Sequence, residues 1–141
     1  MNFMREAVNI AKQSGEDLPI GAVIVKNGKI ISAFHNEKEA KKESSAHAEM
    51  LALQDAQRKL KTCILEDCEI YVTLEPCPMC AWAIIQAKIK KVYFGAYDTL
   101  YGAFGSVTDL RKLANSKTEV IGGLSEEECS TLIKEYFKKI R

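Results

Sequence analysis

The chain has 141 residues, 47% of them hydrophobic, and a formal net charge of +1 at pH 7. This length and composition predict a single domain over residues 1–141, with enough apolar side chains to form a core. Nowhere do eighteen apolar residues follow one another, and the N-terminus has no basic segment followed by an apolar run. We therefore expect a cytoplasmic protein with no signal peptide and no membrane span.

The first third of the chain predicts a helix followed by a hairpin. Apolar residues recur at helical spacing over residues 2–14. Two β-branched apolar runs, at 20–25 and 29–34, flank Asn27-Gly28, the dipeptide most typical of a tight hairpin turn. Two antiparallel strands are expected here.

The middle of the chain predicts helix, strand and helix. Apolar spacing indicates a helix over residues 46–60, with Ser44 or Ser45 as its N-cap. Residues 70–74 are typical of a buried strand, and Pro78 opens a helix that runs to about residue 87.

The last third predicts four further elements: strands at 92–96 and 119–121, and helices at 108–114 and 125–140. Ser125 and Glu128 have the spacing of a capping box. Helices that interleave with strands after an initial hairpin indicate an α/β fold, in which helices cover a mixed sheet of about five strands.

Two short motifs combine into a metal site. His47 and Glu49 form H-x-E, and Cys77 and Cys80 form P-C-x-x-C thirty residues later. Catalytic zinc takes three protein ligands and leaves a fourth position for water, and His47, Cys77 and Cys80 supply three. Glu49 is then available as the catalytic general acid and base, because a carboxylate near the metal can take a proton from that water and pass it on.

The positions of these residues predict how the site is built. His47 and Glu49 point about 200° apart on a helix of 3.6 residues per turn, so they can converge only at its N-terminal end. Cys77 and Cys80 straddle the start of another helix, where free backbone N–H groups favour thiolate over thiol. We expect two helix starts to face one metal ion.

The chain resembles the zinc-dependent cytidine and deoxycytidylate deaminase superfamily, and within it the bacterial tRNA-specific adenosine deaminases. The likeness lies in LPIGAV at 18–23, HN at 35–36, AHAE at 46–49, YVTLEPCPMC at 71–80 and FGAYDTLYGAFGS at 94–106. It implies a cytidine deaminase-like three-layer sandwich, one Zn²⁺ per subunit and a homodimer. It also implies conversion of the wobble adenosine of a tRNA anticodon stem-loop to inosine, with release of ammonia.

The same resemblance implies a set of residues that bind the substrate. Asn36 is expected to hydrogen-bond the target nucleoside and Ile20 to pack against its ring. The remaining substrate-binding positions implied in this way are Ala48, Lys38, Asp98, Phe137 and Arg141. Four of them also have an ordinary alternative role: Asn36 as a turn residue, Ile20 as core, Lys38 as a solvated surface charge and Phe137 as a helix anchor.

The chain also departs from the family pattern. Relatives often carry a lysine after FGA, where this chain has Tyr97, Asp98, Thr99, Leu100 and Tyr101. Together with the near-neutral charge, this keeps open a deaminase of a free nucleobase or nucleoside, of guanine or cytosine type. A non-catalytic structural zinc module is a third hypothesis, and it requires a fourth ligand, Cys68 or His35.

Several apolar residues have two interpretations. Tyr97, Tyr101 and Phe104 can stack RNA bases or pack internally. Around the second metal-binding helix, Trp82, Ile84 and Ile85 can form a dimer interface or complete a monomer core.

Overall fold

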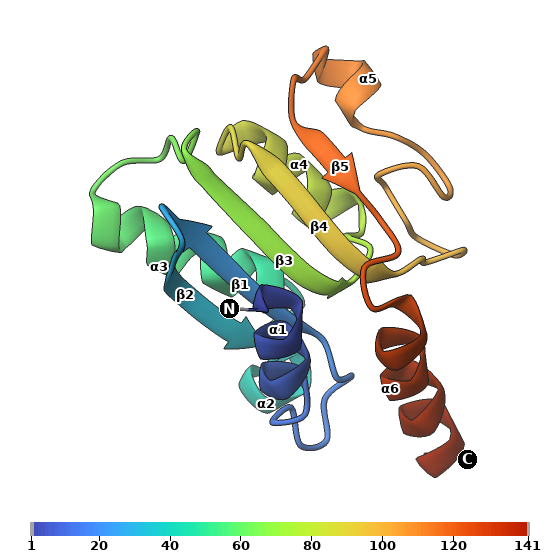
Figure 1. Ribbon diagram of the computed structural model, residues 1–141. Coiled ribbons are helices and arrows are strands. Elements are labelled where there is room, and N and C mark those ends of the chain that lie inside the picture. Colours follow the sequence, from blue (N-terminus) through green and yellow to red (C-terminus); the bar gives the residue numbers. More distant parts are fainter. Residues whose placement is uncertain (1, 141) are drawn as a thin grey trace.

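The computed structural model describes residues 2–140, and its centre is a five-stranded sheet in the order β2-β1-β3-β4-β5 (Figure 1). The strands are β1 (Gly21–Lys26), β2 (Lys29–His35), β3 (Cys68–Leu74), β4 (Lys91–Ala96) and β5 (Glu119–Ile121). β1 runs antiparallel to both β2 and β3, whereas β3, β4 and β5 are parallel. The predicted mixed sheet is confirmed.

Helices cover both faces of this sheet, as Figure 1 shows with α1 and α6 in front and α3 and α4 behind. Their bounds are α1 (Phe3–Ala11), α2 (Lys38–Lys41), α3 (Ala48–Leu60), α4 (Pro78–Gln86), α5 (Arg111–Ala114) and α6 (Glu126–Lys139). The arrangement confirms the predicted three-layer α/β sandwich. None of the helices within residues 2–140 combines the length and the apolar character needed to cross a bilayer.

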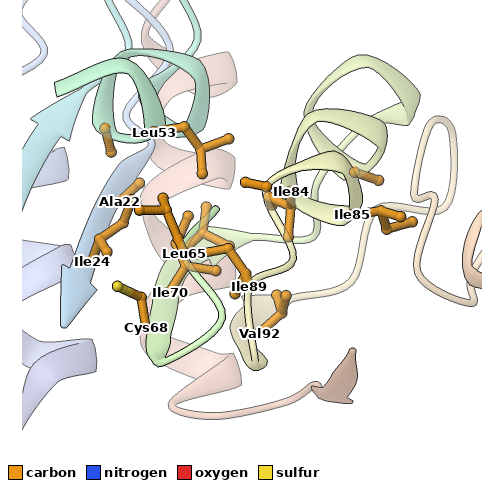
Figure 2. Packing of buried hydrophobic residues seen from close by; sticks show 14 of the residues in the cluster. Ala22, Ile24, Leu53, Leu65, Cys68, Ile70, Ile84, Ile85, Ile89 and Val92 are labelled. Atoms are coloured by element: carbon orange, nitrogen blue, oxygen red, sulfur yellow. The ribbon is translucent and has the colours of Figure 1, made fainter. Parts of the chain in front are cut away.

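The alternation of side chains along β1 explains why the sheet is covered on both sides. Ala22 and Ile24 belong to the cluster under α3 and α4, whereas Val23 and Val25 belong to the cluster under α1. Successive side chains of a strand point to opposite faces, so a strand that is apolar throughout needs helices on each. In Figure 2, Leu53 of α3 and other side chains of the first cluster gather between the two helices and the sheet.

The hairpin between β1 and β2 forms as predicted. Asn27 and Gly28 both have positive φ, at 52° and 74°, which is the backbone of the tight turn that this dipeptide favours. The register shifts once, between Ile24 and Val25.

Two predicted helix caps are wrong. α3 does not begin after Ser44 or Ser45, because His47 itself is the N-cap, with φ −73° and ψ 151°. Ser125 is the N-cap of α6, but it is left-handed (φ 56°, ψ 39°) and its side chain makes no capping hydrogen bond, so the capping box with Glu128 does not form. The first turn of α6 still carries acidic residues, whose negative charges are stabilised by the positive end of the helix dipole.

Candidate metal centre and active site

Two helix N-termini carry the three predicted zinc ligands. His47 is the N-cap of α3, Cys77 is the N-cap of α4, and Cys80 lies in the first turn of α4. Pro78 at the first position of α4 fixes the backbone there, shortly after β3 ends at Leu74. The predicted arrangement of two helix starts around one site is confirmed.

The spacing of the three donor atoms fits a zinc ion. The ligand atoms of His47, Cys77 and Cys80 all lie within 4.8 Å of one another. His47 Nδ1 is 3.7 Å from Cys77 Sγ and 3.5 Å from Cys80 Sγ. Zn–N bonds of about 2.1 Å and Zn–S bonds of about 2.3 Å, at a tetrahedral angle, place nitrogen and sulfur about 3.6 Å apart. The donor set is therefore preorganised for the metal.

The electrostatics of the cysteine pair also favour a divalent cation. A hydrogen bond from Cys80 is the main cause that lowers the pKa of Cys77, to about 4, and His47 contributes to the same shift. The hydrogen bond to Cys77 and burial raise the pKa of Cys80, because a second negative charge beside the first is unfavourable. Zinc binds both sulfurs as thiolates and offsets the charge they carry together.

Glu49 is buried beside the ligand trio, in the first turn of α3, with only 4% of its surface exposed. Its Oε1 has no hydrogen-bond partner within residues 2–140. Burial raises the pKa of Glu49 to about 7. A buried carboxyl oxygen that is not used in a structural hydrogen bond is suited to exchange protons with a reacting group near neutral pH.

A pocket of about 350 Å³ opens over these residues, and His47, Glu49 and Cys77 are part of its lining. Five of the predicted substrate-binding residues also line it: Ile20, Asn36, Lys38, Asp98 and Phe137. A wider cleft of about 730 Å³ lies between α6 and the segment after α1, but it contains none of the zinc-binding residues.

The other two predicted substrate-binding residues do not line this pocket. Ala48 is fully buried in the cluster under α3 and α4. Arg141 lies outside the described residues.

Asn36 has both a structural position and free hydrogen-bonding capacity. It is 6% exposed, its Nδ2 donates to the Leu18 carbonyl oxygen (3.3 Å), and its Oδ1 accepts from the Lys38 backbone N–H (3.2 Å). A carboxamide offers two N–H donors and two acceptor lone pairs, so half of each remains for a ligand in the pocket. The turn role and the binding role are compatible.

The carboxylate of Asp98 shapes the chain locally. Its Oδ1 accepts hydrogen bonds from the backbone N–H groups of Leu100 (2.9 Å) and Tyr101 (3.0 Å). This turn brings Tyr101 to the pocket with 64% of its surface exposed. The aromatic residues of the segment therefore differ in role. Tyr101 is exposed at the pocket, whereas Phe104 is only 4% exposed and belongs to the core.

Two buried acidic residues at the pocket were not predicted. Asp17 is 3% exposed and accepts the backbone N–H groups of Glu39 (2.6 Å) and Ala40 (3.1 Å), which joins the loop before β1 to α2. Glu75 is 2% exposed and accepts hydrogen bonds from the loop after β4. Asp17 has no recognisable motif, whereas the position of Glu75 two residues before Cys77 is a signal that could have been used.

A fourth protein ligand is not present among residues 2–140, where the metal-ligating cluster consists of the predicted trio alone. Cys68 stands at the start of β3, the end away from Cys77, and its sulfur lies beside Asp67. His35 Nδ1 lies 3.0 Å from the Asn36 carbonyl oxygen. The structural zinc module therefore lacks the ligand that it requires.

Residues 1–96 match the family model of the cytidine and deoxycytidylate deaminase zinc-binding region. A tRNA-specific adenosine deaminase of Bacillus subtilis is 43% identical to the chain, over 99% of the chain and 89% of that protein. A solved structure from a study of A-to-I editing by tRNA:A34 deaminases has a TM-score of 0.85 and 35% identity, over 92% of this chain and 97% of its own. A guanine deaminase from Nitrosomonas europaea has a TM-score of 0.82 and 26% identity, over 94% of this chain and 81% of its own.

Proposed function

The chain belongs to the zinc-binding cytidine and deoxycytidylate deaminase family, and we propose that it converts the wobble adenosine of a tRNA anticodon loop to inosine. Its similarity to tRNA-specific adenosine deaminases over nearly the whole length supports this substrate. The observation that carries the proposal is one pocket in which His47, Cys77 and Glu49 meet Asn36 and Phe137. Metal ligands, a proton-transfer group and nucleoside-binding groups are thus within reach of one base.

His47, Cys77 and Cys80 hold one zinc ion per subunit in this proposal. Zinc in a three-ligand site supplies Lewis acidity, which makes water a competent nucleophile near neutral pH. The three side chains contribute by position, because both helix starts are fixed by the packing of α3 and α4 on the sheet.

Glu49 is the proton-transfer residue. The overall reaction replaces the amino group at C6 of adenine with oxygen from water and releases ammonia. Glu49 Oε1 accepts the first proton of the attacking water and delivers it to the ring nitrogen. It then takes the second proton from the hydroxyl group now on C6 and gives it to the amine, which leaves as ammonia while the C6 carbonyl forms. Its burial and its free Oε1 suit the task, because a carboxyl with a pKa of about 7 both accepts and donates protons at neutral pH.

The rest of the pocket wall binds the nucleoside and its neighbours. Ile20 packs against the base, and Asn36 uses its remaining N–H and lone pair to orient the nucleoside. Lys38 is exposed at the pocket edge, where an ammonium group suits an RNA phosphate. Phe137 and Arg141 of the C-terminal segment hold the flanking part of the anticodon loop in this proposal, as the family resemblance implies.

The test is a deamination assay of zinc-loaded protein, followed by mass spectrometry. The substrates are an anticodon stem-loop with a wobble adenosine, the same stem-loop with the adenosine one position away, free adenosine, guanine and cytosine. The proposal expects conversion of the first stem-loop alone. Conversion of a free base with an untouched stem-loop would instead establish the second candidate, a free-nucleobase deaminase, which the fold similarity to a guanine deaminase supports.

We further propose that the protein is a cytoplasmic homodimer and that residues 1–141 form a single domain. Ile84 and Ile85 are buried in the core, so they belong to the protomer, whereas Trp82 is partly exposed and Met79 is 37% exposed on the same helix. This exposed side of α4 supplies apolar surface for a second copy. Light scattering after size exclusion at several concentrations tests the dimer, and a monomer throughout would refute it.

A further inference from the structure

The carboxylate of Glu75 holds the loop that follows β4. Glu75 is 2% exposed, and within residues 2–140 every hydrogen-bond donor to its oxygens lies between residues 98 and 106. Oε1 accepts from the Asp98 N–H (3.1 Å) and the Ser106 hydroxyl, and Oε2 accepts from the N–H groups of Phe104 and Ser106 (both 3.1 Å). Hydrogen bonds to a carboxylate are stronger than neutral ones, so this set fixes the loop firmly.

The loop also lies close to the Glu75 side chain and to the backbone of Pro76. A Cβ atom on Gly102 would lie 2.5 Å from Glu75 Oε1 and 2.4 Å from the Asp98 carbonyl oxygen. The Ala103 N–H donates to the Pro76 carbonyl oxygen at 3.0 Å. The loop is therefore fastened to the segment that leads directly into the metal ligand Cys77.

Glu75 makes no ion pair within residues 2–140, where the salt bridges involve other groups. A buried carboxylate without a cation depends on its N–H and O–H donors. The loop and Glu75 thus stabilise one another: an altered loop would leave the carboxylate unsatisfied, and an altered side chain would release the loop.

The loop presents one aromatic side chain at the pocket. Tyr101 lines the same pocket as His47 and Glu49 and is 64% exposed, whereas Phe104 is buried in the core. The Asp98 carboxylate is occupied by the N–H groups of the turn. Unstacked bases of an RNA loop are commonly bound by stacking on aromatic rings, and an exposed tyrosine at the pocket rim is suited to this.

We propose that Glu75 is a positioning residue that holds the 98–106 loop so that the Tyr101 ring stacks on the nucleotide next to the target adenosine. This inference rests on the proposed function, because the stacked nucleotide belongs to the anticodon loop. Glu75 acts on binding of the flanking RNA and not on the chemical step, since its oxygens are occupied by the loop.

The test compares kcat, KM and zinc content of wild type, Glu75→Gln and Tyr101→Ala on the wobble-adenosine stem-loop. Glu75→Gln keeps the size of the side chain but sets an NH₂ group among N–H donors. We expect both variants to keep their zinc and a kcat within about twofold, with KM raised about tenfold, as expected when one stacked base is lost. In the double variant KM should rise no further, because both changes remove the same contact.

Matched variants separate positioning from general damage. Val107→Ala truncates an exposed loop residue outside the pocket and should leave KM unchanged. Ser106→Ala removes the hydroxyl hydrogen bond and should raise KM as Glu75→Gln does, but by less. It keeps the test available if Glu75→Gln folds poorly. Amide hydrogen exchange in Glu75→Gln should speed up within residues 98–106 and stay unchanged in α3 and α4.

Four results would overturn the inference. Lost zinc or a reduced kcat at unchanged KM would mean that Glu75 supports the metal-binding segment and not the loop. Multiplying KM effects in the double variant would mean that Glu75 and Tyr101 act separately. A wild-type protein that leaves the stem-loop unconverted would refute the proposed function and with it the role of Tyr101 on RNA; an active wild type without the KM rise refutes this inference alone.

Discussion

Replacing Glu49 by glutamine should separate catalysis from metal binding and from stability. Glu49 Oε1 has no hydrogen-bond partner among the described residues, so the change at that oxygen breaks no structural contact. We expect the free energy of unfolding to change by about 1 kcal/mol or less. Turnover should fall about 10³-fold, the loss typical of a missing general acid and base, which corresponds to about 4 kcal/mol in the activation barrier.

The assay measures single-turnover deamination of the stem-loop, zinc content by elemental analysis, and thermal unfolding of the same preparations. Zinc content should stay at the wild-type level, because His47, Cys77 and Cys80 are untouched. Glu66→Gln, at an exposed position away from the pocket, is the control and should behave as wild type. Turnover within tenfold of wild type would refute the proton-transfer role, and loss of zinc would show that Glu49 is needed to hold the metal.

Three further predictions concern metal and stability. Cys80→Ala should lose zinc and lower the melting temperature together, because metal binding is coupled to folding; unchanged zinc and melting would contradict this. Gly21→Ala should cost about 2 kcal/mol of stability in chemical denaturation, because the new Cβ would lie 2.0 Å from the Ala7 carbonyl oxygen and push α1 off the sheet; a cost below about 0.5 kcal/mol would refute the clash. Arg111 lowers the pKa of Asp109 below its ordinary 3.8, so Asp109→Asn should be less stable than wild type above that pH. The difference in stability between the two proteins should disappear as the pH falls below the lowered pKa. A difference that persists in acid would show that the pair does not stabilise by charge.

Local chemistry made the fold and the metal ligands predictable. Asn27-Gly28 specifies its turn through two positive φ angles, which few other dipeptides adopt easily. The H-x-E and P-C-x-x-C motifs specify the ligands because zinc demands particular atoms and a helix start brings close spacings together. The strand over Glu119–Ile121 was predicted with its observed bounds.

The two wrong predictions of helix caps show where tertiary contacts override local sequence preferences. Ser125 has the sequence of a capping box, but the chain must turn sharply from β5 into α6 there. The Leu124 N–H donates to the Phe94 carbonyl oxygen (3.1 Å), and Gly123 has φ 83°. This hydrogen bond and the turn at Gly123 lead the chain into Ser125 with a left-handed backbone, which keeps the Ser125 side chain away from the first N–H groups of the helix. At the start of α3, His47 takes the capping position, and its imidazole faces the cysteines.

The pocket-wall residues that the family resemblance did not supply were the hardest part to predict, and the reason is sequence separation. The Tyr136 hydroxyl donates to the Glu16 carbonyl oxygen across 120 residues, and Asp17 reaches the start of α2 across 22. Contacts of this kind leave no periodic pattern and no motif, because each pair is complementary only once the sheet has assembled. The catalytic motif therefore identifies the reaction, whereas in our proposal substrate binding also depends on wall residues such as Glu75 and Tyr101. Two chains with identical zinc motifs can accept different substrates for this reason. The KM effects expected at Glu75 and Tyr101 measure directly how much the pocket wall contributes to substrate binding.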